Sequence, residues 1–128
     1  MANPLYGQNK IDDFQDAGDF ISVQCVLGTA TSNDVYLVVP KACEVTTVYS
    51  CINQALSTAD ENIVVKSSQG TLGTITITQS GSAAADIDSV SPTSNNKLAA
   101  GEYLWLDIGG ENGTAAECYV TIVCKPLS

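Results

Sequence analysis

The sequence predicts an all-β protein: a single-domain antiparallel β-sandwich or jelly-roll-like barrel of about seven strands, with an extended N-terminal arm. Short runs rich in β-branched and aromatic residues recur along the chain. Clusters of Ser, Asn, Asp and Gly separate these runs as turn signals. No stretch shows the apolar spacing of a long helix. Because 128 residues fit one domain, we expect an arm over 1–19 and a β-sandwich over 20–128.

The arm differs in composition from the rest of the chain. It is rich in aspartate, and its candidate anchors are the apolar residues Leu5, Tyr6, Ile11 and Phe14. The carboxylates and Gly18 disfavour a long helix. Two interpretations stay open. The arm is either a disordered tail or a segment that orders against a partner through these four residues.

Seven strands are expected after the arm, at 20–27, 35–39, 43–52, 61–66, 72–78, 103–108 and 118–124. The second is apolar at every position, so we expect it to be covered on both faces. In the fifth, Ile75 and Ile77 alternate with threonines, which places the isoleucines towards the core. Residues 79–101 are small and polar and are expected to form a long functional or mobile loop. Residues 109–113 predict a hairpin between the last two strands.

The composition argues against catalysis and against nucleic-acid binding. The chain has no His and no Arg, and five lysines face fourteen carboxylates for a net charge of −9. Histidine is the commonest general base and metal ligand, and the guanidinium of arginine is the preferred bidentate donor to phosphate. Scattered lysines make a poor surface for nucleic acid or anionic membranes. We therefore expect no enzyme, no catalytic residue, no cofactor and no metal, and neither nucleic acid nor membrane as a partner.

The acidic residues and the cysteines are candidate metal ligands. Asp86 and Asp88 could offer oxygens to calcium, but they lack the ligand spacing of an EF-hand loop, which favours a solvated acidic turn. The five cysteines include no C-x-x-C pair, which argues against zinc. Two interpretations remain for them: small buried hydrophobes or a cross-strand disulfide. The two-residue period puts all of them except Cys25 on shared strand faces: Cys118 with Cys124, and Cys43 with Cys51.

Tyr103 and Trp105 alternate on one expected strand and so share a face. If that face is exposed, the two rings can stack on a sugar or on a partner side chain. If it is the core face, the tryptophan packs inside. The low charged fraction of 15% also has two interpretations, because it fits either a surface that faces a partner or a hydroxyl-rich monomer.

The stretch 73–89, GTITITQSGSAAADIDS, followed by 95–102, NNKLAAGE, resembles small β-rich virion proteins of tailed bacteriophages, which are often head decoration or cement proteins. The likeness runs from about residue 35 to the C terminus. It implies a structural protein that binds the major capsid protein on the outer surface of the shell and stabilises it, commonly as a homotrimer. The start of the chain lacks the pattern of a signal peptide, so we expect synthesis in the host cytoplasm and a place in the virion.

Two other functions stay open at this point. One is a phage tail or fibre domain, and the other is a carbohydrate-binding β-sandwich module. The second of these needs exposed aromatic rings, for which Tyr103 and Trp105 are the candidates. The partner-contact residues predicted from the sequence are therefore the four arm residues together with this pair.

Overall fold

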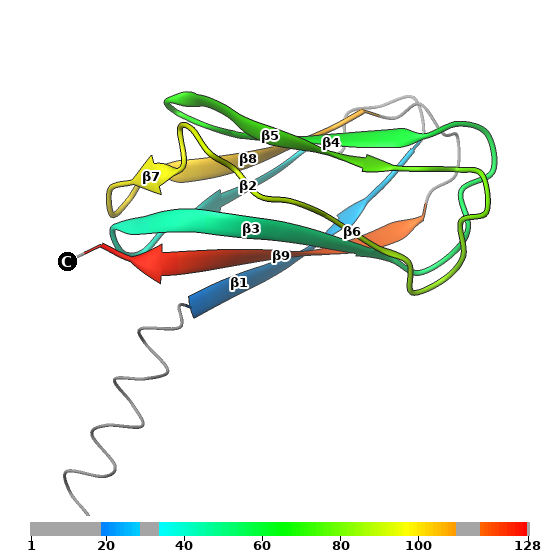
Figure 1. Cartoon of the computed structure of the whole chain (residues 1–128), viewed down its shortest axis with the longest axis horizontal. Coiled ribbons are helices and arrows are strands. Elements are labelled where there is room, and N and C mark those ends of the chain that lie inside the picture. The colour runs from blue at the N-terminus through cyan, green and yellow to red at the C-terminus, as the bar shows by residue number, and fades with distance from the viewer. Residues whose placement is uncertain (1–18, 29–33, 110–115, 128) are drawn as a thin grey trace, which may run out of the picture.

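The computed structural model describes residues 19–28, 34–109 and 116–127, and it shows an all-β sandwich (Figure 1). The strands are β1 (Asp19–Val26), β2 (Val35–Val38), β3 (Cys43–Ile52), β4 (Glu61–Ser67), β5 (Gly70–Ile77), β6 (Ile87–Val90), β7 (Lys97–Leu98), β8 (Tyr103–Ile108) and β9 (Glu117–Pro126). One antiparallel sheet has the order β1-β9-β3-β6, with β7 also paired to β3, and the other has the order β2-β8-β4-β5. The predicted fold class is confirmed.

Alternation along the strands builds the core between the two sheets. In β5, Ile75 and Ile77 are buried while Thr74 and Thr76, which alternate with them, are exposed, as the sequence predicts. Leu104 and Leu106 in β8 and Val120 in β9 alternate in the same way, and their side chains are fully buried. Every second side chain therefore points inwards, and the intervening positions form the two outer faces of the sandwich. None of the described residues forms a helix that could cross a membrane.

The segment 79–101 differs from the expected loop because it contains two short strands. β6 pairs with the second half of β3, and β7 pairs with the first two residues of β3. Asn96 lies beside the β-bulge between Val45 and Thr47 and donates a hydrogen bond to the carbonyl of Val45 at 2.9 Å. Asn95 donates to the carbonyl of Thr71 at 2.9 Å. These two side-chain amides attach the segment to both sheets. The strands β6 and β7 are short and polar, so the sequence does not distinguish them from a loop.

Two further expectations are wrong. β2 is not covered on both faces, because it is the outermost strand of its sheet and the Tyr36 and Val38 side chains are about 60% and 63% exposed. Residues 109–113 do not join a hairpin, because β8 and β9 belong to different sheets. A glycine-rich connection can join two strands of one sheet or two strands of different sheets. Its composition is the same in both cases, so the sequence alone does not distinguish them.

The cysteines are free thiols, and four of them are buried as small hydrophobes. Cys25 lies directly opposite Cys118 in the β1–β9 pair, and its thiol donates to the carbonyl of Cys118 at 3.4 Å. The predicted shared face of Cys43 and Cys51 is wrong. The bulge in β3 adds one residue and reverses the alternation, so Cys43 faces the core whereas Cys51 is on the outer face.

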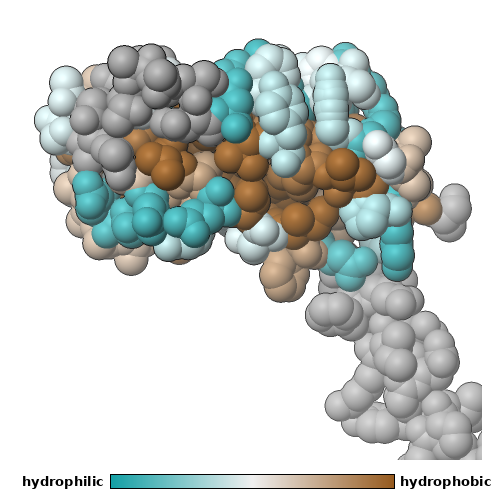
Figure 2. Space-filling view, turned by 180° about the vertical axis from the view of Figure 1, so that it is seen from behind, coloured by the Kyte–Doolittle hydropathy of each residue, from teal (hydrophilic) through white to brown (hydrophobic). Residues whose placement is uncertain are grey.

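The two flanks of the sandwich differ. On one flank β5 and β6 approach so closely that a Cβ on Gly73 would lie 2.7 Å from the Val90 side chain. On the other flank the outermost strands are β1 and β2, which both lie towards the back in Figure 1. Figure 2, seen from that side, shows a band of hydrophobic residues running along the molecule between more polar rims.

Candidate functional site

The outer face of the β1-β9-β3-β6 sheet is the first candidate site. Strand register brings twelve uncharged outward-facing side chains together across the four strands, and Glu44, Glu117 and Lys125 border them at the strand ends. We call this surface the uncharged face. It consists of Phe20, Ser22, Gln24, Val26, Thr47, Tyr49, Cys51, Ile87, Ser89, Tyr119, Thr121 and Val123.

Large apolar side chains on this face are strongly exposed. Phe20 and Ile87 are 63% and 66% exposed, and Tyr49 and Tyr119 are 43% and 45% exposed. One continuous row crosses the sheet through Gln24, Tyr119, Cys51 and Ile87. Exposed rings and aliphatic groups without charges are the composition found in the centres of protein interfaces.

Charged residues occur only at the ends of this face. Glu117 lies at one end of β9, and Lys125 lies opposite Glu44 near the other end. The Tyr119 hydroxyl donates to the Glu117 carboxylate at 3.0 Å. This hydrogen bond and the negative charge of Glu117 raise the pKa of Tyr119. The arrangement resembles an interface with an apolar centre and a polar rim.

The second candidate lies on the opposite face of the sandwich, on the β2-β8-β4-β5 sheet. Trp105 stacks on Tyr36 with ring centres 5.6 Å apart and planes 15° apart. Tyr103 meets Tyr36 edge-on at 6.2 Å. We call Tyr36, Tyr103 and Trp105 the aromatic cluster. The two residues predicted from the sequence therefore share an outer face, and Tyr36 joins them from the neighbouring strand.

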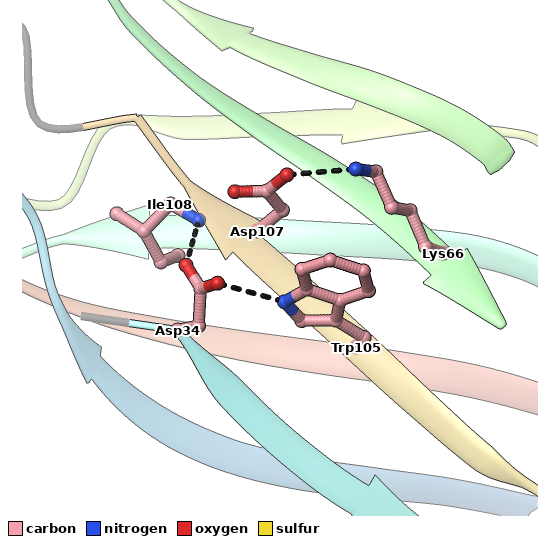
Figure 3. A network of polar contacts seen from close by, with 5 residues as sticks. All are labelled: Asp34, Lys66, Trp105, Asp107 and Ile108. Atoms are coloured by element: carbon pink, nitrogen blue, oxygen red, sulfur yellow. Dashed lines mark hydrogen bonds and ion pairs between the residues drawn. The ribbon is translucent and has the colours of Figure 1, made fainter. Parts of the chain in front are cut away.

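Polar groups hold Trp105 in place, as Figure 3 shows. Its indole N–H donates to Asp34 Oδ2 at 2.9 Å, and Asp34 Oδ1 accepts the backbone N–H of Ile108 at 3.0 Å. From β4, Lys66 Nζ lies 4.4 Å from the centre of the indole ring and 2.8 Å from Asp107 Oδ2. Tyr36 and Lys66 come from the strands on either side of Trp105. Trp105 is therefore a half-buried support, and Tyr36 offers the more accessible ring.

The remaining predictions have different outcomes. Leu5, Tyr6, Ile11 and Phe14 lie outside the described residues. The uncharged face was missed by sequence reasoning, because its residues come from four strands whose order is not evident in the chain. The alternation in 20–26 and 119–123 is visible in the sequence, but it does not show that these two runs pair.

The acidic turn holds its carboxylates through local contacts. Asp86 Oδ2 accepts the backbone N–H of Ala83 at 2.8 Å. Partial burial, together with the nearby Asp86 carboxylate, raises the pKa of Asp88. Within the part of the chain that the structure describes, no three His, Cys, Asp or Glu side chains gather as a set of metal ligands. The turn therefore offers no assembled cation site.

No protein-family model matches the chain, and no curated protein matches its sequence. Solved structures match its fold. The module CsCBM6-3 from Clostridium stercorarium, in complex with cellobiose, is 14% identical with a TM-score of 0.53, over 84% of this chain and 93% of that chain. The CBM36-1 domain of a multidomain xylanase from the hindgut metagenome of Trinervitermes trinervoides is 13% identical with a TM-score of 0.53, over 81% and 96%.

A chain of the cyanophage Pam1 capsid is also similar, at 9% identity with a TM-score of 0.49, over 87% of each chain. The likeness to the carbohydrate-binding modules establishes a common β-sandwich fold. It does not assign a ligand, because one fold supports many functions. A TM-score below 0.5 does not establish a shared fold with the capsid chain. Function therefore has to be argued from the surfaces of this molecule.

Proposed function

We propose that this chain is a structural protein of a phage particle, without enzymatic activity, that binds the outer surface of the shell and stabilises it. The proposed partner is the major capsid protein. The observation that carries the proposal is the uncharged face. The resemblance of 73–89 and 95–102 to virion proteins indicates that the particle is a tailed phage, and it also implies a homotrimer.

The charged side chains on the outer face of this sheet lie at the strand ends, and the twelve positions between them hold none. Charged residues make up 15% of the chain, so twelve average positions would hold about two. This face holds none, in a protein with a net charge of −9. Like charges in the centre of an interface cost binding energy, whereas exposed rings and methyl groups gain it when water is removed.

The size of the face bears on how it would bind. Each outward residue covers about 4.8 Å by 6.8 Å of sheet, so the uncharged face spans roughly 400 Å². A standard interface buries about 800 Å² on each partner. The remainder would come from neighbouring loops, the N-terminal arm or further copies. Attachment of several copies to a repeating shell compensates for a small single contact, because linked contacts raise the effective concentration.

A second candidate function is carbohydrate binding by the aromatic cluster. The observation that favours it is Tyr36, whose ring is 60% exposed and is held by stacking on Trp105. A preorganised ring costs little entropy when a ligand stacks on it. Titration with cellobiose or xylose, followed by Trp105 fluorescence, tests this function. Saturable quenching that Tyr36→Ala removes would support it, and an unchanged signal up to millimolar sugar would reject it.

The main proposal is tested by mixing the purified chain with phage capsids that lack it and sedimenting the particles. We expect saturable co-sedimentation and a higher melting temperature of the particle. Free chain that stays in the supernatant at every concentration would overturn the proposal.

A deletion separates the arm from the sandwich in the same assay. Removing residues 2–18 leaves β1 whole, because that strand begins at Asp19. If Leu5, Tyr6, Ile11 and Phe14 anchor the chain, occupancy on the particle falls. Undiminished occupancy would restrict the contact to the sandwich and would reject the role predicted for the arm.

A further inference from the structure

The flank of the sandwich between β1 and β2 is only partly covered. Ile21 and Val23 in β1 and Val35 and Leu37 in β2 point inwards but are only half-buried. On the opposite flank, Leu72, Ile75 and Ile77 in β5 are 6% exposed or less, and Val90 in β6 is half-buried. We call the β1/β2 side the open flank.

The open flank also presents backbone groups that lack a strand partner. The N–H of Leu27 donates to the carbonyl of Ala116 at 2.8 Å, which fixes the odd-numbered residues of β1 as those bonded to β9. The N–H and C=O groups of the even-numbered residues therefore point away from the sheet. Among the described residues no strand pairs with that side of β1. These residues are Phe20, Ser22, Gln24 and Val26.

The edge of β2 is open for the same reason. The N–H of Val39 donates to the carbonyl of Glu102 at 2.8 Å, so the odd-numbered residues bond to β8. The backbone groups of Tyr36 and Val38 point outwards, where no described strand pairs with them. Two neighbouring edges on one flank are thus free, with apolar side chains between them.

The edge of β1 lacks the features that usually protect a sheet from pairing with another chain. Natural edges carry lysine, proline or an inward-facing charge, or they are very short. β1 has eight residues, and its only charged residue is Asp19 at its start. β2 has no charge and no proline, and its four residues make it the shorter of the two edges. On the opposite flank, by contrast, the outermost strand β6 carries Asp88 at a half-buried position.

We propose that the open flank is an association surface for a second copy of this chain, in which edge strands of the two copies pair and their apolar bands cover each other. A second copy fits because it brings two free edges at the same separation and an apolar band between them. A single extended peptide would fill only one edge. Between Phe20 and Val26, and between Val35 and Val39, there is no charge, so two acidic copies meet there without repulsion.

One symmetry operation satisfies both edges. A two-fold axis perpendicular to the strands and running from sheet to sheet places β1 against β1 and β2 against β2, each pair antiparallel, as in the self-complementary contacts of homo-oligomers. The proposal uses the backbone edge of β1, whose side chains Phe20, Ser22, Gln24 and Val26 form one border of the uncharged face, and it does not depend on binding to a particle.

The first test is amide hydrogen exchange by NMR on the full chain at two concentrations. In a single copy the N–H groups of Ser22 and Gln24 have no partner among the described strands, whereas those of Val23 and Cys25 point to β9. We expect Ser22 and Gln24 to be protected at least tenfold more at high concentration than at low, with Val23 and Cys25 protected at both. Fast exchange of Ser22 and Gln24 at every concentration would overturn the proposal.

The second test compares two variants by light scattering. Ser22→Pro removes an outward N–H without removing a bond to β9, and Ser22→Ala is its matched control. Both variants lose the hydrogen bond, 3.2 Å long, between the Ser22 and Thr121 hydroxyls. We expect wild type and Ser22→Ala to associate, and Ser22→Pro to associate at least tenfold more weakly while it melts cooperatively.

Three other outcomes of the second test would contradict the proposal. A wild-type chain that stays monomeric at about 100 µM would overturn it, as would a folded Ser22→Pro that associates like wild type. If wild type is monomeric and the chain without residues 2–18 associates, the chain's own arm covers the flank instead of a second copy. If Ser22→Pro does not fold, the exchange experiment on wild type decides.

Discussion

The two outer faces of this sandwich are made of similar strands but differ in the contacts that their exposed side chains make. On the β2-β8-β4-β5 sheet, charged and aromatic side chains satisfy one another: Lys66 contacts Asp107 at 2.8 Å and Trp105, and Trp105 donates to Asp34 at 2.9 Å. On the β1-β9-β3-β6 sheet, rings and aliphatic groups such as Phe20 and Ile87 face water. The first face holds Trp105 through contacts of its own, whereas the exposed groups of the second gain stability when a partner covers them.

Thiol reactivity should show the largest contrast. Cys51 is half-exposed on the uncharged face, whereas the other four cysteines are buried. Burial raises the pKa of Cys124 to about 12 and also raises that of Cys43, so these thiols are almost entirely protonated and unreactive at pH 8.

We expect one thiol of the native chain to react with an aromatic disulfide reagent at least about a hundredfold faster than the rest, which react on unfolding. Mass spectrometry should identify it as Cys51, and bound particles should protect it. Five equally reactive thiols in the native chain would contradict the burial described here. Fewer than five in the denatured, non-reduced chain would indicate a disulfide.

Truncation of a ring should affect stability on one face far more than on the other. Trp105→Ala removes a half-buried ring, its stacking on Tyr36 and a hydrogen bond to the Asp34 carboxylate. We expect a loss of about 2–3 kcal/mol in the free energy of unfolding. Tyr119→Ala, on the uncharged face, should cost about 0.5–1 kcal/mol, because its ring is largely exposed. Urea unfolding measures both, and equal losses would remove the contrast between the faces.

The charged contact beside Trp105 should matter least. Lys66→Met removes the ion pair with Asp107 and the cation above the indole ring, but it keeps much of the aliphatic packing. Partly exposed pairs of this kind contribute about 0.2–1 kcal/mol. We expect a fall in stability within that range in low salt, and a smaller fall in about 0.5 M NaCl because salt screens the pair. A loss above about 2 kcal/mol would mean that this contact is essential to the sheet.

The sequence was sufficient for the fold class because alternation repeats in several long strands, as Ile75 and Ile77 illustrate. It was insufficient where one extra residue reverses the alternation of side chains in a strand, or where paired strands are distant in the sequence. The bulge after Val45 turned Cys51 outwards, and no local pattern marks it. β6 and β7 are too short and polar to be distinguished from a loop.

The candidate site was predictable only in part. Tyr103 and Trp105 share a face because they are two residues apart on one strand, and the period of a strand requires that. Their support by Asp34, Tyr36 and Lys66 depends on the order of β2, β8 and β4, which alternation does not give. The uncharged face requires the order of four strands, so its members were visible one by one but not as a surface.

The most direct test of the central claim places the same charge on each face. Thr121→Lys introduces a cation into the uncharged face, and Thr74→Lys introduces it at an outward position of β5 on the opposite sheet. Co-sedimentation with capsids that lack the protein is then compared with wild type. The account predicts at least about thirtyfold weaker binding for Thr121→Lys, corresponding to about 2 kcal/mol at an interface centre, and unchanged binding for Thr74→Lys, with both variants folded. Equal binding by the two variants, or a loss confined to Thr74→Lys, would contradict it.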